Sequence, residues 1–431
     1  MNEKSLLQKN KYFLSSIKLR LLIFISVFGP ATITAMSDND AAGVATYSIA
    51  GAKLGYPILF PLVIITILLG ITQEMGMRLT LVTRRALADL IRERFGVRAS
   101  LFMFSALFIA NIGTIIVDLA AVKTTSSLLH LPEIPFLLFI ILFTYLFVTK
   151  GNYKLTQSIM LLSSLLYVAY IFSAIQAKPD WGLALSNLIY PHGPKGMVFD
   201  NSYLKDFLLI GMGVLGTTIT PWGQFFVSSF AGDKAIEKGK ILYSQIETYL
   251  GALLTDFFSF FMIIATAATL YVNGITIESG EQAAMAIKPF AGELASTLFA
   301  IGILNAGFMG IVVISLSTAY AFSEFFGLSG SLDTDFKQSK IFYSVFLIQL
   351  VIAGIATLIP GVSLFNLAVL AQTINAMALP VVFYYLIRLT SDKKLMGDHR
   401  NTSFQKYFTT AASILIVIAS IFTVIAIFIK F

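Results

Sequence analysis

The chain has 431 residues, of which 57% are hydrophobic and only 12% charged, and its mean hydropathy is +0.83. Soluble domains carry about 25% charged residues, so the composition excludes a soluble protein and predicts a polytopic membrane protein. The chain contains no cysteine, which excludes disulfides and thiolate metal ligands.

Apolar runs long enough to cross a bilayer as helices, about 20 residues each, recur along the chain, and we predict eleven spans. The polar, basic segment 1–20 precedes them and lacks the features of a cleavable signal peptide. The spans are expected at 21–50, 56–83, 100–125, 133–149, 155–177, 205–230, 241–273, 291–327, 341–359, 363–390 and 405–429. Between the second and third, Leu87–Arg98 is typical of a short amphipathic cytoplasmic helix.

Lysine and arginine are distributed unevenly over the predicted loops. With the N-terminus inside, 22 of them fall in inside segments and 6 in outside segments. This asymmetry predicts a cytoplasmic N-terminus and an extracellular C-terminus in the plasma membrane. It also explains the net charge of +7 without a nucleic-acid partner.

The first apolar run is interrupted by Gly29-Pro30 and then by Asp38, Asn39 and Asp40. Ionisable groups at membrane depth are costly and are functional candidates by default. Gly-Pro followed by small and polar residues is typical of a helix that breaks midway, and a break exposes carbonyl oxygens. We predict that Asp40 is a cation ligand and that Asp38 is a weaker candidate. Pairing with a lysine or a water-filled vestibule is the alternative.

The sixth span contains a second break signal, TTITPW at 217–222. Pro221 removes a helix hydrogen bond and frees the carbonyl of Thr217, which with Thr220 could face an ion; a plain proline kink is the alternative. The second break lies five spans after the first, so the halves must be inverted in the membrane, as in transporters that bind substrate between two broken helices.

This arrangement predicts an all-α protein with a cytoplasmic N-terminal segment, two five-helix repeats and a last helix. The expected boundaries are 1–20, 21–177 for the first repeat, 178–204 for an extracellular loop, 205–390 for the second repeat, and 391–431 for a cytoplasmic loop and the eleventh helix.

The tenth span carries Gln372 and Asn375, three residues apart and therefore on one helix face. Both are candidate ligands, although such amides also join helices in membranes. Glu74 and Arg78 have the spacing of a structural ion pair. Four further acids are candidate gate or proton-path residues: Asp118, Glu247, Asp256 and Glu324.

These residues resemble those of the NRAMP family of divalent-metal transporters over nearly the whole chain. The family's first span reads like GPGFLVSIAYMDPGN followed by FATDIQAGAQFGY, its third carries DLAE, and its tenth ends in LTSDRRLMG. The matching segments here are 29–40, 50–56, 118–120 and 389–397. The resemblance places the family's metal-binding Asp on Asp40 and its tenth-span Gln on Gln372. It implies the LeuT-like fold with eleven helices.

Five positions depart from the family pattern. The Asn of DPGN is Gly43, and the metal-binding Met of the sixth-span motif ATxMPH is Thr220. The two sixth-span histidines fall on Trp222 and Val227, and the Glu of DLAE on Ala121. A thioether favours transition metals, so its loss, together with the loss of the Asn, predicts a roomier site of hard oxygen ligands.

Such a site suits Mg²⁺, which dehydrates reluctantly and keeps several waters. The pattern is similar to the divergent NRAMP-related magnesium transporters. We therefore expect a monomeric secondary transporter, without a resident cofactor, that imports partly hydrated Mg²⁺ and also Mn²⁺, with weak or absent proton coupling. The alternatives are a proton-coupled Mn²⁺/Fe²⁺ transporter, a symporter for an organic amine, and a metal receptor that does not transport. No nucleotide-phosphate loop or nucleophile–base pair suggests an enzyme.

Overall fold

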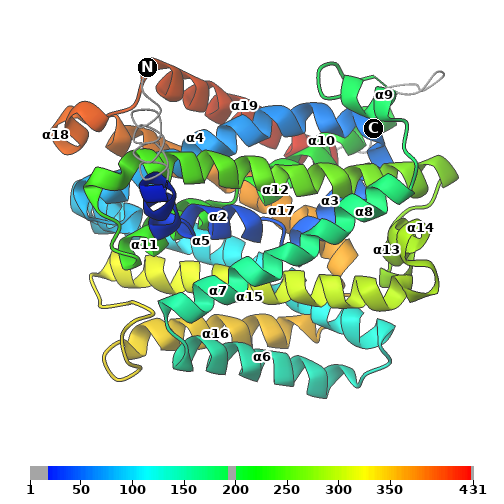
Figure 1. Cartoon of the computed structure of the whole chain (residues 1–431), viewed down its shortest axis with the longest axis horizontal. Helices are drawn as coiled ribbons and strands as arrows, with labels where there is room; N and C mark the ends of the chain where they lie inside the picture. Colours follow the sequence, from blue (N-terminus) through cyan, green and yellow to red (C-terminus); the bar gives the residue numbers. More distant parts are fainter. Residues whose placement is uncertain (1–17, 193–199, 429–431) are drawn as a thin grey trace, which may run out of the picture.

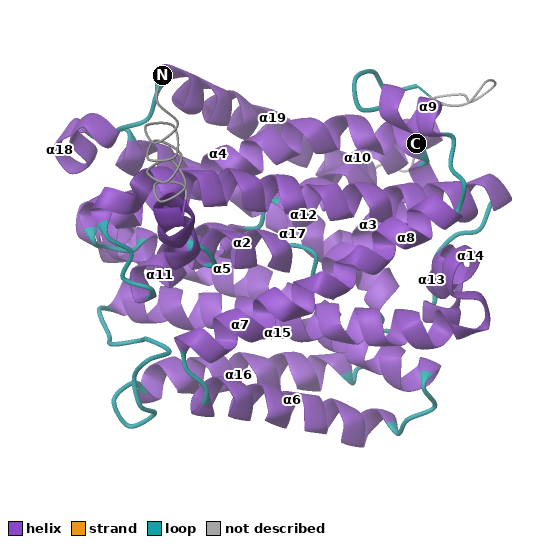
Figure 2. Ribbon diagram, viewed as in Figure 1, coloured by secondary structure: helices purple, strands orange, loops and turns teal. Residues whose placement is uncertain are grey.

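The computed structural model describes residues 18–192 and 200–428. Most of the predicted segment 1–20, part of the predicted loop 178–204 and the last three residues lie outside these ranges. Within them the chain forms helices joined by turns and loops, without a strand (Figure 2).

Nine helical stretches in the described part of the chain are long and apolar enough to cross a membrane. They run roughly side by side along the length of the molecule (Figure 1). They are built from α4 (Leu59–Thr83), α5 (Leu87–Leu128), α6 (Glu133–Lys150), α7 (Tyr153–Ser164) with α8 (Val168–Gln176), α12 (Ile241–Thr269), α15 (Ala295–Phe326), α16 (Lys340–Thr357), α17 (Leu364–Thr390) and α19 (Ser403–Phe428).

Two further spans are broken. The first consists of α2 (Pro30–Ser37) and α3 (Ala41–Leu54), and the chain already bends by 54° between Lys18–Val27 and α2. The second consists of α10 (Asn201–Thr218) and α11 (Pro221–Asp233). With the nine continuous stretches they give eleven spans, and the breaks lie in spans one and six as predicted.

Side-chain caps start the new helix at two short links between spans. Asn152 accepts a hydrogen bond from the Leu155 N–H at 2.9 Å and starts α7. Ser363 accepts from the Asn366 N–H at 3.3 Å and starts α17. Both links therefore separate two spans, because the cap satisfies a backbone N–H that the new helix leaves free.

The short helix predicted at Leu87–Arg98 is present as the first part of α5, although it ends at Gly96. Gly96 (φ 84°, ψ 178°) is not helical, so a kink separates this short helix from the rest of α5. The amphipathic pattern is present, because Leu87, Leu90 and Ile91 are buried. A positive φ at Gly96 changes the helix direction at no steric cost, which the residue pattern alone did not show.

The broken spans lie in the middle of the molecule. α2 packs against α12 and α15, and α3 packs against α12, α15 and α17. α10 packs against α17, and α11 packs against α15 and α17. Figure 1 shows α2 and α3 near the centre of the view. The connections carry four short helices: α9 (Trp181–Ser186), α13 (Gly280–Ala284), α14 (Lys288–Ala291) and α18 (Lys393–Met396).

Candidate metal site

The first break is the tripeptide between α2 and α3. Asp38 ends α2, and Asp40 is the N-cap of α3, where its Oδ1 accepts a hydrogen bond from the Gly43 N–H at 2.6 Å. The N-terminus of a helix carries partial positive charge and favours a carboxylate. The break therefore holds two acidic side chains, each only 1% exposed.

Asn39 fixes the conformation of this break. Its amide Nδ2 donates to the carbonyl and the hydroxyl of Thr255 at 3.1 and 2.8 Å, and its Oδ1 accepts from the Ser259 hydroxyl at 2.9 Å. The Tyr167 hydroxyl donates to the Asn39 carbonyl at 2.7 Å. The sequence shows this Asn in the break, but its role could not be predicted because all its partners come from distant spans.

The second break directly contacts the first. The Thr220 hydroxyl donates to Asp38 Oδ1 at 3.1 Å and accepts from the Gly223 N–H at 3.0 Å as the N-cap of α11. The Thr217 hydroxyl lies 3.4 Å from the Asp38 carbonyl oxygen. Pro221 is the first residue of α11, and α10 ends at Thr218, so the predicted break is present and the alternative of a plain proline kink is wrong. Thr217 makes this contact through its hydroxyl, and a ligand role for its carbonyl stays a prediction.

The tenth span, α17, contributes an amide pair. Asn375 Nδ2 donates to Gln372 Oε1 at 2.6 Å and to the Thr114 hydroxyl at 3.0 Å. Gln372 Nε2 and Asn375 Oδ1 are buried without a hydrogen-bond partner in the described ranges. Asn375 thus holds Gln372 in place, and no hydrogen bond among the described residues joins either amide to Asp38 or Asp40.

Asp118 belongs to this site, although it was predicted only as a gate or proton-path residue. Its Oδ1 lies 3.2 Å from the Ala42 N–H, in the first turn of the helix that Asp40 caps. A Cβ at Gly310 of α15 would lie 2.2 Å from Asp118 Oδ2 and 2.7 Å from Asp40 Cβ. Asp118 and Asp40 therefore both lie against Gly310.

The expectation that Gly43 leaves open room is wrong. A Cβ at Gly43 would lie 2.3 Å from the Asp38 carbonyl oxygen and 2.9 Å from the Thr217 hydroxyl. Atoms of both breaks therefore occupy the space that the Cβ of the family's Asn would need at this position. Any extra room for water must lie elsewhere around Asp40.

The residues that replace the family's histidines are fully buried. Trp222 and Val227 are both 0% exposed, and the indole N–H of Trp222 has no partner in the described chain. No group of three His, Cys, Asp or Glu side chains suited to a metal ion occurs among the described residues. The available ligand set at the breaks is therefore aspartate oxygens together with hydroxyl, amide and backbone oxygens, all of which are hard ligands.

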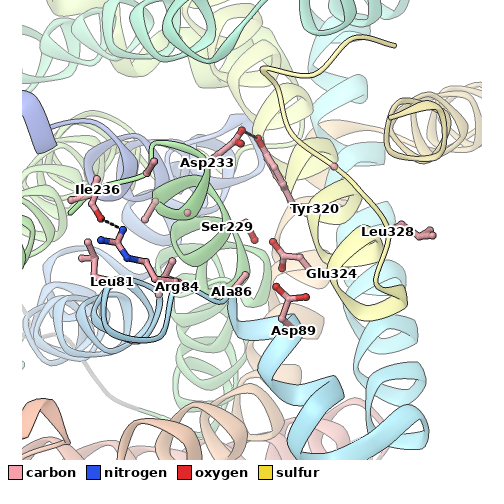
Figure 3. Close-up of a pocket in the computed structure, with 15 residues that line it drawn as sticks. Leu81, Arg84, Ala86, Asp89, Ser229, Asp233, Ile236, Tyr320, Glu324 and Leu328 are labelled. Atoms are coloured by element: carbon pink, nitrogen blue, oxygen red, sulfur yellow. Dashed lines mark hydrogen bonds between the residues drawn. The ribbon is translucent and has the colours of Figure 1, made fainter. Parts of the chain in front are cut away.

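A cavity lies away from the breaks. It has a volume of about 380 Å³ and lies where α4, α11 and α15 end and α5 begins. Figure 3 shows Asp89 and Glu324 pointing toward one another in it. Asp233 accepts from Tyr320 and Ser331 at 2.5 Å each, and Asp89 pairs with Arg92 at 3.5 Å. Asp233 and Asp89 are therefore committed to structural contacts, whereas Glu324 Oε2 has no hydrogen-bond partner in the described chain. With one such acid, the cavity is a weaker candidate than the breaks.

Two of the other predicted acids also have structural partners. Glu74 and Arg78 form the expected ion pair at 2.6 Å, which Gln245 and Gln405 extend by donating to the carboxylate. Glu247 Oε1 accepts from the backbone N–H groups of Gly29 and Thr32 at 2.8 and 2.9 Å. Glu247 therefore anchors the start of α2 and does not reach the aspartates.

Known proteins share both this sequence pattern and this architecture. A relative named divalent metal cation transporter MntH, from Caldanaerobacter subterraneus, is 23% identical over 93% of this chain and 91% of its own. Crystal structures of the Eremococcus coleocola manganese transporter include one with a TM-score of 0.77 and 19% identity, covering 93% of this chain and 86% of that one. A Na⁺-coupled sialic acid symporter gives a TM-score of 0.56 at 13% identity, covering 93% and 90%.

The two structural likenesses confirm the predicted LeuT-like, five-plus-five fold. The first relative and the first structure are named as metal transporters and not as enzymes. The profile described as Nramp, natural resistance-associated macrophage protein-like, matches residues 31–426. The chain belongs to the Nramp family.

Proposed function

We propose that this protein is a secondary transporter of divalent cations that imports partly hydrated Mg²⁺, and Mn²⁺ as a second substrate, by alternating access. The observation that carries the proposal is the contact between the breaks: Asp38, two residues before Asp40, accepts a hydrogen bond from a threonine, Thr220, where the family has methionine. Carboxylate and hydroxyl oxygens suit a hard ion, and a thioether does not.

In this proposal Asp40 is the main charged ligand, and the helix N-terminus that it caps holds its carboxylate in position. Asp38, Thr217, Gln372 and Asn375 supply further oxygen atoms directly or through waters that the ion keeps. Mg²⁺ is commonly bound through one or two carboxylates and several waters. Gly43 allows the two breaks to approach each other.

The proposed setting is the plasma membrane, with a cytoplasmic N-terminus, an extracellular C-terminus and a monomeric transporter. The charge asymmetry of the loops supports this orientation. Weak or absent proton coupling is part of the proposal, because Trp222, Val227 and Ala121 replace the family's titratable side chains.

The experiment is uptake of Mg²⁺ and Mn²⁺ into proteoliposomes, combined with calorimetry of both ions. We expect the wild type to bind and move Mg²⁺ and Asp40→Ala to do neither. Transport of Mn²⁺ or Fe²⁺ without Mg²⁺ would refute the hard-ligand argument. Internal acidification that follows metal uptake would refute the claim of weak coupling.

Position 220 offers a matched pair of variants. Thr220→Met restores the family's thioether, and Thr220→Val removes the hydroxyl without adding sulfur; both lose the cap on Gly223, which costs about 1 kcal/mol. We expect the preference for Mn²⁺ over Mg²⁺ to rise in Thr220→Met only. An equal change in both variants would show that the loss of the cap, and not the ligand type, sets selectivity.

A proton-coupled manganese transporter is the second candidate. The name of the structural relative from Eremococcus coleocola favours it, and so does the position of Asp118, a third buried acid at the breaks that could carry a proton. Uptake that accelerates in an inward proton gradient, and that loses this dependence in Asp118→Asn, would support this candidate over the first.

A further inference from the structure

Asp256 is a buried acid that the proposed transport site does not use. It lies on α12, is 4% exposed, and neither of its carboxylate oxygens has a hydrogen-bond partner in the described chain. Its neighbours Thr255 and Ser259 hold Asn39. Asp256 instead lines a cavity, and such an unpartnered acid at membrane depth requires a physical explanation.

The cavity has a volume of about 370 Å³, within the usual range of small-molecule sites. Its walls are apolar and come from α4, from the region of α9 and from α12, including Val63, Leu185 and Phe257. These three side chains are 38%, 51% and 48% exposed, so the cavity opens on the surface. On this membrane protein, that apolar surface faces lipid.

Thr66 is the other polar side chain in the lining. It lies close enough to interact with the Asp256 carboxylate, but its hydroxyl proton is donated to the Leu62 carbonyl at 2.8 Å. The cavity therefore offers one carboxylate in an apolar surround. A divalent ion would lack the six or more oxygen ligands that it needs, and an anionic ligand would be repelled by Asp256.

We propose that this cavity binds a lipophilic amine, with its ammonium group paired to Asp256 and its hydrocarbon part among the apolar walls. Burial of a lone carboxylate is costly, and a cation of opposite charge at hydrogen-bond distance offsets that cost. The apolar lining adds the stabilisation that comes from removing the alkyl chain from water. Asp256 lies close enough to Asp38 for an electrostatic interaction, but it lines a different cavity, and the proposal does not depend on the proposed transport of metal ions.

The test compares octylamine with octanol, which has the same chain but no charge, on the purified full-length protein in nanodiscs. Thermal unfolding is followed by tryptophan fluorescence. We expect octylamine to raise the unfolding temperature saturably, and at a concentration at least tenfold lower than octanol. Equal effects of the two compounds on the wild type would overturn the proposal.

Two variants locate the site. Asp256→Asn keeps the shape and removes the charge, and Val63→Trp fills the cavity from an exposed position; both should abolish the advantage of octylamine. Asp40→Asn, which alters only the metal site, should keep it. Octylamine and octanol partition into the nanodisc lipid to the same extent whichever variant is present, so this effect cancels when the variants are compared. The proposal would be wrong if octylamine still stabilised Asp256→Asn or Val63→Trp at a lower concentration than octanol. It would also be wrong if this difference between the two compounds disappeared in Asp40→Asn.

Discussion

Gly43 is the residue at which the two breaks approach most closely. Gly43→Ala places a Cβ 2.3 Å from a backbone oxygen, which cannot move away as a flexible side chain could. Overpacking of this kind costs about 1–3 kcal/mol. We expect metal uptake in proteoliposomes to be largely lost and the unfolding temperature to fall.

Gly113 on α5 provides the control for this substitution. A Cβ added at Gly113 would have no atom within 4 Å, and alanine is favoured over glycine in a helix by roughly 0.5–1 kcal/mol. Gly113→Ala should therefore transport like the wild type and unfold at an equal or higher temperature. Normal transport by Gly43→Ala would show that the breaks can separate without loss of function.

The acids of the site could be predicted from the sequence, but their partners could not. Asp38 and Asp40 stand out because an apolar run makes any carboxylate conspicuous. The role of Asn39 depends on Thr255 and Ser259, which are more than 200 residues away. Asp118 is conspicuous for the same reason, yet only the packing of α5 against α15 places it beside Asp40.

At the scale of elements, α2 is a short helix held by side chains from other spans. Glu247 caps its N-terminus, and the Phe28 carbonyl just before it accepts from Gln157 Nε2 at 3.3 Å and from the ammonium group of Lys234. A helix of eight residues has little intrinsic stability. These contacts therefore determine how firmly the element that carries Asp38 is held.

Lys234, which follows α11, makes this anchor sensitive to pH. Burial lowers the pKa of Lys234 from 10.5 to about 8; Glu247 opposes the shift and Lys240 adds to it. The folded protein thus releases this proton at lower pH than the unfolded chain. The unfolding free energy should gain a contribution that rises with pH between about 8 and 10.5.

The measurement is the unfolding midpoint of the wild type and of Lys234→Met over this pH range. Subtracting the midpoint of Lys234→Met from that of the wild type removes the titration of other groups. We expect this difference to increase as pH rises, because the wild type gains stability that the variant does not. A constant difference would mean that Lys234 titrates normally in the folded protein.

The order and type of the elements could be predicted because apolar runs in a membrane must be helices or strands of a closed barrel. Local backbone geometry was harder to predict. One non-helical residue, Gly96, separates the two parts of α5, while two residues, Ile219 and Thr220, separate α10 from α11. In the sequence, both sites show only glycine or proline beside polar residues. The local geometry depends on which groups bind the backbone that the break leaves free. At the second break, the Thr220 hydroxyl caps α11 and contacts the Asp38 carboxylate.

At the scale of the whole molecule, the site lies where the two halves meet, and it is closed. Asp38 and Asp40 come from the first half, while Thr220 and Gln372 come from the second, and none is more than 1% exposed. An ion cannot enter or leave this arrangement unless the halves move relative to each other. This burial is what alternating access requires of one of its states.

The contact between α5 and α15 joins the halves beside the site, and Gly310 lies at its centre. Gly310→Ala would insert a methyl group between Asp118 and Asp40. Gly302, on the same helix, has no atom within 4 Å of the position of an added Cβ, so Gly302→Ala is the matched control. Overpacking by about 1–3 kcal/mol corresponds to a loss of metal affinity of about five- to 150-fold.

We therefore expect calorimetry to show weakened metal binding in Gly310→Ala and unchanged binding in Gly302→Ala, with both proteins folded in detergent. Because the added methyl group touches acids of the first half from a helix of the second, the loss should affect Mg²⁺ and Mn²⁺ alike. Thr220→Met, in contrast, should alter the preference between the ions. Equal binding by Gly310→Ala and the wild type would mean that Asp40 binds metal only after α15 has moved away from it, and that the closed arrangement is not the one that holds the ion.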